Sequence, residues 1–238
     1  MKQLTLFALL VLALGACKKD KNDDPQPGSA QICLVDSLIS EGSIQKHYYD
    51  AQNRLVKTIS TGSDTDVFIQ NLEYNGNVVV VKIEGQDGEQ VVYLNSKGFM
   101  DSLVYEIPLG SIHGKVTYNA SGQMTQLEIT GEILGTVLDQ ITTYEWLNGD
   151  IANETTVQDG DTTTVTHTYD VTKSNSLAAL ETRLSFLPSS AHLITKSVYF
   201  DDTEITYAYV LDANNKVIKK ITTDADGPSD EFYTWVCK

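Results

Sequence analysis

The chain has 238 residues and a formal net charge of −15 at pH 7. A field of that sign repels nucleic acid and anionic lipid, so the composition argues against nucleic acid as a partner. Hydrophobic residues make up 41% of the chain, which at this length is enough to build the core of one large all-β domain or two small ones.

The first segment is typical of a secretory signal peptide. Lys2 gives a positive start, and the apolar run from Leu4 to Leu14 is too short to span a bilayer as a helix. The run ends in Leu14-Gly15-Ala16-Cys17, which resembles the lipobox of bacterial lipoproteins. The resemblance implies a signal peptide over 1–16 and a diacylglycerol on Cys17, whose acyl chains would anchor the protein to a membrane.

A polar stretch follows the lipobox. Residues 18–30 read KKDKNDDPQPGSA and contain no large apolar side chain, so residues 17–30 are predicted to be the lipidated Cys and a flexible tether. A charged patch in this place resembles the surface-export signals of Bacteroidetes lipoproteins. We therefore expect an outer-membrane lipoprotein that faces the cell surface, with a periplasmic spacer as the alternative.

The remainder, 31–238, is predicted to be a single all-β domain. Polar and apolar side chains alternate along segments such as 161–170 and 204–211, and turn pairs such as Asn75-Gly76 separate the segments. The segments number about 14 to 16, which is more than an open twisted sheet usually holds. We expect an antiparallel up-and-down meander curled into a half-barrel or barrel, or folded into two layers. Charges at strand centres, such as Lys57 and Lys82, argue against a transmembrane barrel.

One segment has helical rather than strand periodicity. Leu177, Leu180, Leu184 and Leu187 lie at helical spacing, and Pro188 ends the pattern. The spacing predicts one short helix near 175–187 that covers an open end or the concave face of the sheet. The alternative is a lid over a ligand cavity.

Two cysteines remain after Cys17. Cys33 and Cys237 lie in the first and last predicted strands, and an exported chain is in an oxidising compartment. We expect a disulfide between them, which requires the two terminal strands to touch. The alternative is two buried thiols.

Tyrosines precede many of the predicted turns at intervals of about 25 residues, the length of one hairpin repeat. The recurring Tyr-Asn or Tyr-Asp pattern resembles the YD repeats, which are the Tyr-Asp hairpins of rearrangement-hotspot-type proteins. Residues 192–223 and 232–238 more closely resemble uncharacterised Bacteroidetes lipoproteins, whose Tyr-rich domains have no known function. Asn214-Asn215 departs from the usual Asp-Gly turn. The resemblance implies an envelope β-meander protein without an established activity.

The sequence contains no catalytic signature. It has no Gly-x-Ser-x-Gly elbow, His-Glu-x-x-His motif or phosphate loop, and its four histidines lack metal-ligand spacing. Acidic clusters in 199–206 and 222–231 are interpreted as turns. We therefore expect no enzyme, metal or cofactor, and a hydrolase is the least favoured alternative.

Aromatic rows are the remaining candidates for a binding site. Aromatic side chains two residues apart share one face of a strand, where they either stack on a ligand or form core. The candidate ligand-binding residues are Tyr144, Trp146, Tyr207, Tyr209 and Trp235.

Three short motifs resemble a Bacteroidetes O-glycosylation signal, in which Asp precedes Ser or Thr. They place hypothetical modifications on Ser37, Ser102 and Thr162. An unmodified intact mass of the protein from its native cell would exclude all three.

These features predict a lipid-anchored, monomeric envelope protein with a non-catalytic binding or scaffolding role. Its expected partner is a glycan, a peptide or another envelope protein. The alternative is a periplasmic carrier or assembly factor with an apolar ligand cavity.

Overall fold

The computed structural model describes residues 32–62 and 67–238. The predicted signal peptide, the tether and the lipidated Cys17 lie outside the described residues. The described chain forms sixteen strands and one helix, with these bounds: β1 (Cys33–Ser40), β2 (Ser43–Tyr49), β3 (Leu55–Thr61), β4 (Val67–Asn75), β5 (Val78–Ile83), β6 (Glu89–Leu94), β7 (Met100–Ile107), β8 (Gly110–Tyr118), β9 (Met124–Ile133), β10 (Thr136–Leu147), β11 (Asp150–Gln158), β12 (Asp161–Ser174), α2 (Ala178–Ser185), β13 (His192–Tyr199), β14 (Glu204–Leu211), β15 (Val217–Asp224) and β16 (Gly227–Cys237).

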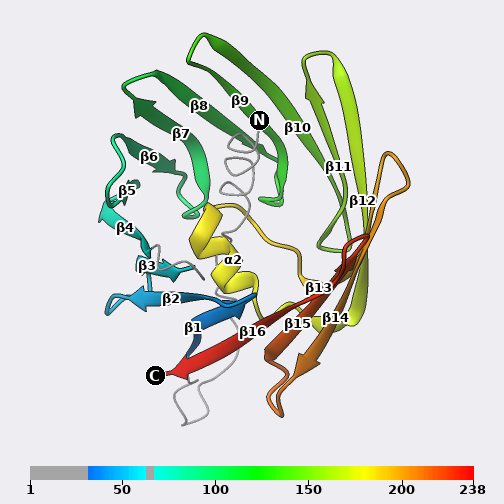
Figure 1. The fold of residues 1–238 in the computed structure, drawn as a ribbon. Helices are drawn as coiled ribbons and strands as arrows, with labels where there is room; N and C mark the ends of the chain where they lie inside the picture. The colour runs from blue at the N-terminus through cyan, green and yellow to red at the C-terminus, as the bar shows by residue number, and fades with distance from the viewer. Residues whose placement is uncertain (1–31, 63–66) are drawn as a thin grey trace.

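The strands form a closed antiparallel barrel in which each strand pairs with its neighbours in sequence (Figure 1). The predicted up-and-down meander is confirmed, and of the three arrangements considered it adopts the barrel. Closure joins β1 to β16, where Cys33 lies opposite Cys237 in the register. The two cysteines form a disulfide that closes the barrel covalently across 204 residues of sequence separation.

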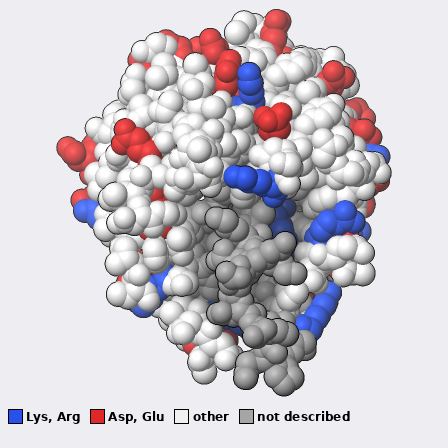
Figure 2. Space-filling model, turned by 180° about the vertical axis from the view of Figure 1, so that it is seen from behind, with Lys and Arg blue, Asp and Glu red and all other residues white. Residues whose placement is uncertain are grey.

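The barrel has an apolar interior and a mixed outer face. Leu55, Val79 and Met124 point inward and are at most 2% exposed. Side chains alternate along each strand, so the neighbours of these inward rows face outward. Charged outward residues recur around the barrel, for example Lys57 on β3 and Lys82 on β5, and Figure 2 shows both signs of charge scattered over one face. This outer face differs from the continuous apolar band with which a transmembrane barrel contacts lipid.

Helix α2 lies inside the barrel (Figure 1). The predicted helix near 175–187 is confirmed, although its regular part is shorter, and Phe186 ends it in the left-handed region at φ 58°. Leu180 joins the apolar cluster of Val35 and Val217, whereas Phe186 joins the larger cluster around Leu55. The helix thus fills one end of the lumen and links the two clusters.

No helix among the described residues is long and apolar enough to cross a membrane.

Four turns at one end of the barrel share the same construction. Each follows an even-numbered strand and begins with Asp or Asn, whose side-chain oxygen accepts backbone N–H bonds from inside the turn. The fourth residue of each turn has positive φ, and the residue that starts the next strand is at most 2% exposed. The turns begin at Asp50, Asn95, Asn119 and Asp212. The turns at Asp50 and Asn119 follow a Tyr, whereas those at Asn95 and Asp212 follow a Leu.

Candidate functional site

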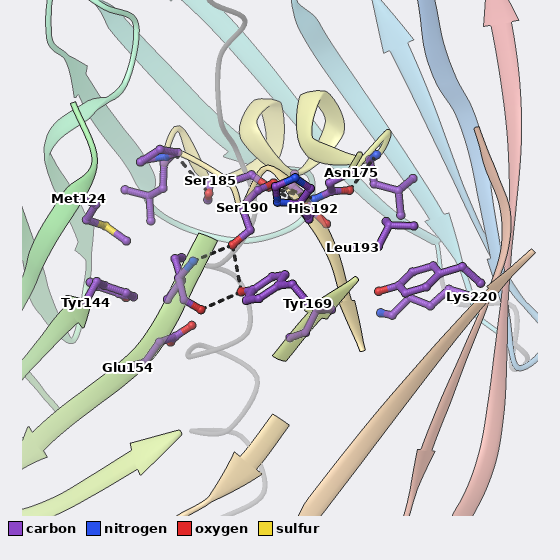
Figure 3. A pocket seen from close by; sticks show the side chains of 18 of the residues that line it. Met124, Tyr144, Glu154, Tyr169, Asn175, Ser185, Ser190, His192, Leu193 and Lys220 are labelled. Atoms are coloured by element: carbon purple, nitrogen blue, oxygen red, sulfur yellow. Dashed lines mark hydrogen bonds between the residues drawn. The ribbon is translucent and has the colours of Figure 1, made fainter. Parts of the chain in front are cut away.

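A cavity of about 320 Å³ lies beside α2 within the lumen (Figure 3). Its walls come from the helix, from the segment that follows the helix, and from inward side chains of β9 to β16. The lining residues are Met124, Tyr144, Ile151, Glu154, Tyr169, Asn175, Leu177, Glu181, Ser185, Leu187, Pro188, Ser189, Ser190, His192, Leu193, Ile194, Tyr209, Lys220 and Tyr233.

The volume suits a small ligand. An engineered apolar cavity of about 150 Å³ binds benzene, so a cavity twice that size would hold roughly a dozen non-hydrogen atoms. The volume also falls at the lower end of the range of natural ligand pockets, about 300 to 1,000 Å³.

Hydrogen bonds fix the wall formed by the segment after α2. Ser190 Oγ accepts a bond from the Ile151 N–H at 3.0 Å and donates to the Tyr169 phenol oxygen at 2.9 Å. Tyr169 in turn donates to the Ile151 carbonyl at 2.9 Å. Next to Ile151 on β11, the Asp150 carboxylate accepts bonds from the His192 backbone N–H at 2.9 Å and from Nδ1 of the His192 ring at 2.8 Å. The wall is therefore tied to β11 and β12 without a ligand, as a preformed pocket requires.

Two phenols in the cavity have no hydrogen-bond partner. Tyr144 is 6% exposed, and neither its hydroxyl nor that of Tyr209 bonds to any residue the structure describes. Burial raises the pKa of both phenols, and the negative charges of Glu154 near Tyr144 and Glu181 near Tyr209 raise it further. Both therefore stay protonated at neutral pH and can donate or accept a hydrogen bond to a ligand.

The charged groups of the cavity are partly compensated. Glu154 Oε1 contacts Nε2 of His167 at 3.1 Å, and Lys220 Nζ contacts Glu231 Oε2 at 3.2 Å. Glu181 differs because it accepts bonds only from neutral groups, Nδ2 of Asn175 at 2.9 Å and the Ser189 hydroxyl. Within the described residues, no ion pair includes Glu181.

The structure places the five candidate aromatic residues inside the barrel. Tyr144 and Tyr209 line the cavity. Tyr207 lies beside it, with its hydroxyl 3.4 Å from Ser197 Oγ and its ring 5.5 Å from Lys220 Nζ.

The two tryptophans have a structural role. The Trp146 indole N–H donates to the Met124 carbonyl at 2.6 Å, and that of Trp235 donates to the Val217 carbonyl at 2.9 Å. Both rings pack against the apolar clusters. An aromatic strip on the outer face is thus not formed by the five candidates.

Sequence reasoning missed the polar half of the cavity. Asn175, Glu181, Ser189 and Ser190 flank or interrupt the helical leucine pattern, where they read as caps and exposed positions. The signal that could have identified them is the concentration of serines around Pro188, because a segment entering an apolar lumen must satisfy its own backbone groups.

Three inward residues form a hydrogen-bonded row next to the cavity. His167 Nδ1 lies 3.0 Å from Ser197 Oγ, and its Nε2 lies 3.1 Å from Glu154. A Ser, His and acid in this order resemble the relay of serine hydrolases. Ser197 is 1% exposed and is not part of the cavity lining, so its hydroxyl is not presented to a substrate. In the part of the chain that is described, no group of three or more His, Cys, Asp or Glu residues is placed to hold a metal ion.

The three hypothetical glycosylation sites differ in accessibility. Ser37 is 9% exposed and shares a hydrogen bond of 2.7 Å with Thr234. Ser102 lies half-buried on β7, whereas Thr162 is exposed at the start of β12. Only Thr162 is therefore fully open to an enzyme that would modify the folded barrel.

No known protein family matches the chain, and no curated protein matches it. Solved structures do match. One is a porin-like protein from Bacteroides uniformis ATCC 8492, with TM-score 0.62, 15% identity, and coverage of 89% of this chain and 94% of that one. Another is a porin-like protein from Bacteroides vulgatus ATCC 8482, with TM-score 0.62, 11% identity, and coverage of 84% and 97%. This chain shares their barrel fold. At these identities the likeness extends to the fold alone.

Proposed function

We propose that the protein is a non-catalytic binding protein of the bacterial outer envelope that holds a small ligand in the cavity beside α2. The observation that carries the proposal is a cavity of about 320 Å³ with a hydrogen-bonded wall and two unpartnered phenols, Tyr144 and Tyr209. A ligand that bonds to these two hydroxyls would gain hydrogen bonds that the protein itself does not make.

The location follows from two features of the chain. The lipobox-like Leu14–Cys17 would place acyl chains at the start of the tether, and the likeness to porin-like barrels supports an outer-membrane association. The charges on the outer face favour a barrel held at the membrane surface by its anchor. The lumen then serves as a binding compartment.

A lumenal ligand fits the structure better than a glycan on an outer aromatic strip. The five candidate aromatic residues face inward. Exposed aromatic residues outside that set, such as Tyr48, Tyr93 and Phe232, lie on separate strands. The carrier alternative from the sequence is therefore favoured, with a cavity that is more polar than expected. Scaffolding remains the second role if the cavity holds no ligand.

We propose that the row of Glu154, His167 and Ser197 is structural. A serine hydrolase needs an accessible Oγ, and Ser197 is buried by its neighbours. A fluorophosphonate probe should leave Ser197 unlabelled, as judged by peptide mass spectrometry. Labelling that disappears in Ser197→Ala would establish the hydrolase instead.

The test of ligand binding compares a filled cavity with an open one. Ile194→Trp adds volume inside the cavity, whereas Val198→Trp places the same side chain on the outer face of the same strand. Each protein is purified from its native cells and denatured, and the released small molecules are identified by mass spectrometry. The same molecule should be released from the wild type and from Val198→Trp, and it should be absent from Ile194→Trp. Equal release from all three proteins would contradict the proposal.

A further inference from the structure

We propose that the cavity selects an organic cation, a ligand that carries an ammonium group on an apolar or aromatic body. This inference rests on the proposed function and adds the chemical class of the ligand. Two observations carry it together: the Glu181 carboxylate borders the cavity without a cationic partner, and four tyrosines line the same space, Tyr144, Tyr169, Tyr209 and Tyr233.

The first step is the charge balance of the lining. The Lys220 ammonium is paired with the Glu231 carboxylate at 3.2 Å. Glu154 and Asp150 each contact an imidazole nitrogen, that of His167 at 3.1 Å and that of His192 at 2.8 Å, and these contacts are ion pairs only when the ring is protonated. Glu181 has only the amide of Asn175 and the hydroxyl of Ser189, which leave its charge uncompensated. A cation in the cavity would supply the missing charge, and a charge-assisted hydrogen bond to a carboxylate is stronger than a neutral one.

The second step is the aromatic wall. The ring faces of tyrosine attract cations, and sites that bind ammonium groups commonly surround them with aromatic rings. Tyr144 is only 6% exposed, and its unpartnered hydroxyl points into the cavity. Its oxygen can accept a bond from an ammonium N–H. The apolar side chains of Met124, Ile151 and Leu193 would contact the body of the ligand.

The third step excludes an anionic ligand. Lys220 is the only lysine or arginine in the cavity lining, and Glu231 already neutralises it. An anion would face Glu154 and Glu181 within a chain of net charge −15. The field of the whole protein therefore repels anions and raises the local concentration of cations.

The experiment uses three probes with the same aromatic body and different charge: phenethylamine as the cation, phenethyl alcohol as the neutral probe and phenylacetate as the anion. Each is titrated calorimetrically into the purified full-length chain at pH 7. We expect phenethylamine to bind about tenfold tighter than the alcohol, within the range of a desolvated cation–aromatic contact, and phenylacetate to bind weakest.

Three variants localise the effect. Glu181→Gln should remove the preference for the amine, whereas Glu132→Gln, which removes the same charge from the exposed outer face of β9, should keep it. Tyr209→Phe removes the unpartnered hydroxyl and retains the ring, so it should weaken phenethylamine binding relative to the wild type and still bind the amine more tightly than phenylacetate. This result stands as a test by itself if Glu181→Gln fails to fold. The unfolding midpoint of each variant reports on folding.

Each other outcome overturns the inference. If the alcohol or phenylacetate binds as tightly as the amine, the cavity is not cation-selective, although it still binds ligands as proposed. If Glu132→Gln loses the preference as fully as Glu181→Gln, the effect is one of net charge rather than of this cavity. If no probe binds, the organic-cation site is refuted. The proposed function is decided separately, by whether a native ligand is released from the wild type but not from Ile194→Trp.

Discussion

At the scale of single residues, His47 is a buried imidazole without a hydrogen-bond partner among the described residues. It is 2% exposed, and neither ring nitrogen has a hydrogen-bond partner in the structure. The hydroxyl of Thr58, its cross-strand neighbour, is also buried without a partner. Burial lowers the pKa of His47 from 6.5 to about 4, although the negative charge of Asp36 acts to raise it. The ring is therefore neutral in the folded protein at pH 7.

This burial predicts a loss of stability in mild acid. The unfolded chain binds a proton at His47 below about pH 6.5, whereas the folded protein binds it only near pH 4. The free energy of unfolding should therefore fall between those pH values, by up to about 3 kcal/mol from this group. His47→Phe should flatten the dependence in that window, as followed by guanidinium unfolding. The exposed His113→Phe is the control, and an equal effect of both variants would show that burial of His47 is not the cause.

At the scale of elements, inward aromatic residues tie the two strands of a hairpin together. Tyr49 donates to the Val35 carbonyl at 2.7 Å, Tyr169 to the Ile151 carbonyl at 2.9 Å, and Trp235 to the Val217 carbonyl at 2.9 Å. Each bond runs from an even-numbered strand to the first residues of the odd-numbered strand before it. Among the tyrosines that precede the predicted turns, Tyr49, Tyr118 and Tyr169 make such a bond.

The shared turn makes a testable contribution to stability. In the turn between β8 and β9, the Asn119 side-chain oxygen accepts the Gln123 N–H at 3.0 Å. Asn119→Ala should lower the free energy of unfolding by about 1 kcal/mol, the usual cost of one such bond. Ser121→Ala in the same turn is the control, because Ser121 is exposed. The idea fails if chemical unfolding shows equal losses for the two variants.

Many of the strands and the helix could be predicted from the sequence. Alternation along 204–211 and the leucine spacing over 177–187 are local signals, and both elements form as expected. Before the turn at Asn95, Tyr93 points outward and is 41% exposed, and Leu94 takes the inward position that Tyr49 and Tyr118 have before their turns. Period-two alternation defines two faces of a strand without specifying which one is inside, so neither this shift nor the inward direction of Tyr144 was predictable.

At the scale of the whole molecule, closure of the barrel decides where a site can be. The number of strands predicted a curved sheet, but only the pairing of β1 with β16 encloses a lumen. The cavity depends on α2 meeting inward side chains that range from Met124 on β9 to Tyr233 on β16, which is a contact among distant segments. The candidate residues from the sequence include two of the four lining tyrosines, Tyr144 and Tyr209, and omit Glu181 and the serines of the lining.

The disulfide should contribute strongly to the stability of the closed barrel. It links residues 204 apart in sequence, and a loop of that size corresponds to at most about 5 kcal/mol in the chain-entropy model. Cys33→Ser should lower the free energy of unfolding toward that extent, as measured by guanidinium unfolding. Reduction of the wild type should reproduce the loss, and reductant should have no further effect on the variant. Equal stability of the oxidised and reduced wild type would contradict this prediction.

The proposed anchor predicts how the barrel is held in the cell. Cys17→Ser should move the protein from the membrane fraction to a soluble one, since the lipid would be its only stable attachment. Protease shaving of intact cells, detected with an antibody to residues 31–238, then tests the side. Loss of the domain while periplasmic markers survive supports the cell surface. Protection of the domain would place it in the periplasm, and retention of Cys17→Ser in the membrane would contradict the anchor.

The most direct test of a ligand inside the barrel is a crystal structure of the protein purified from its native cells. The account predicts electron density in the cavity beside α2, from a small molecule in contact with the phenol oxygens of Tyr144 and Tyr209 and with the Glu181 carboxylate. A cavity that contains only ordered water, in crystals of protein that was never denatured or exchanged, would contradict it.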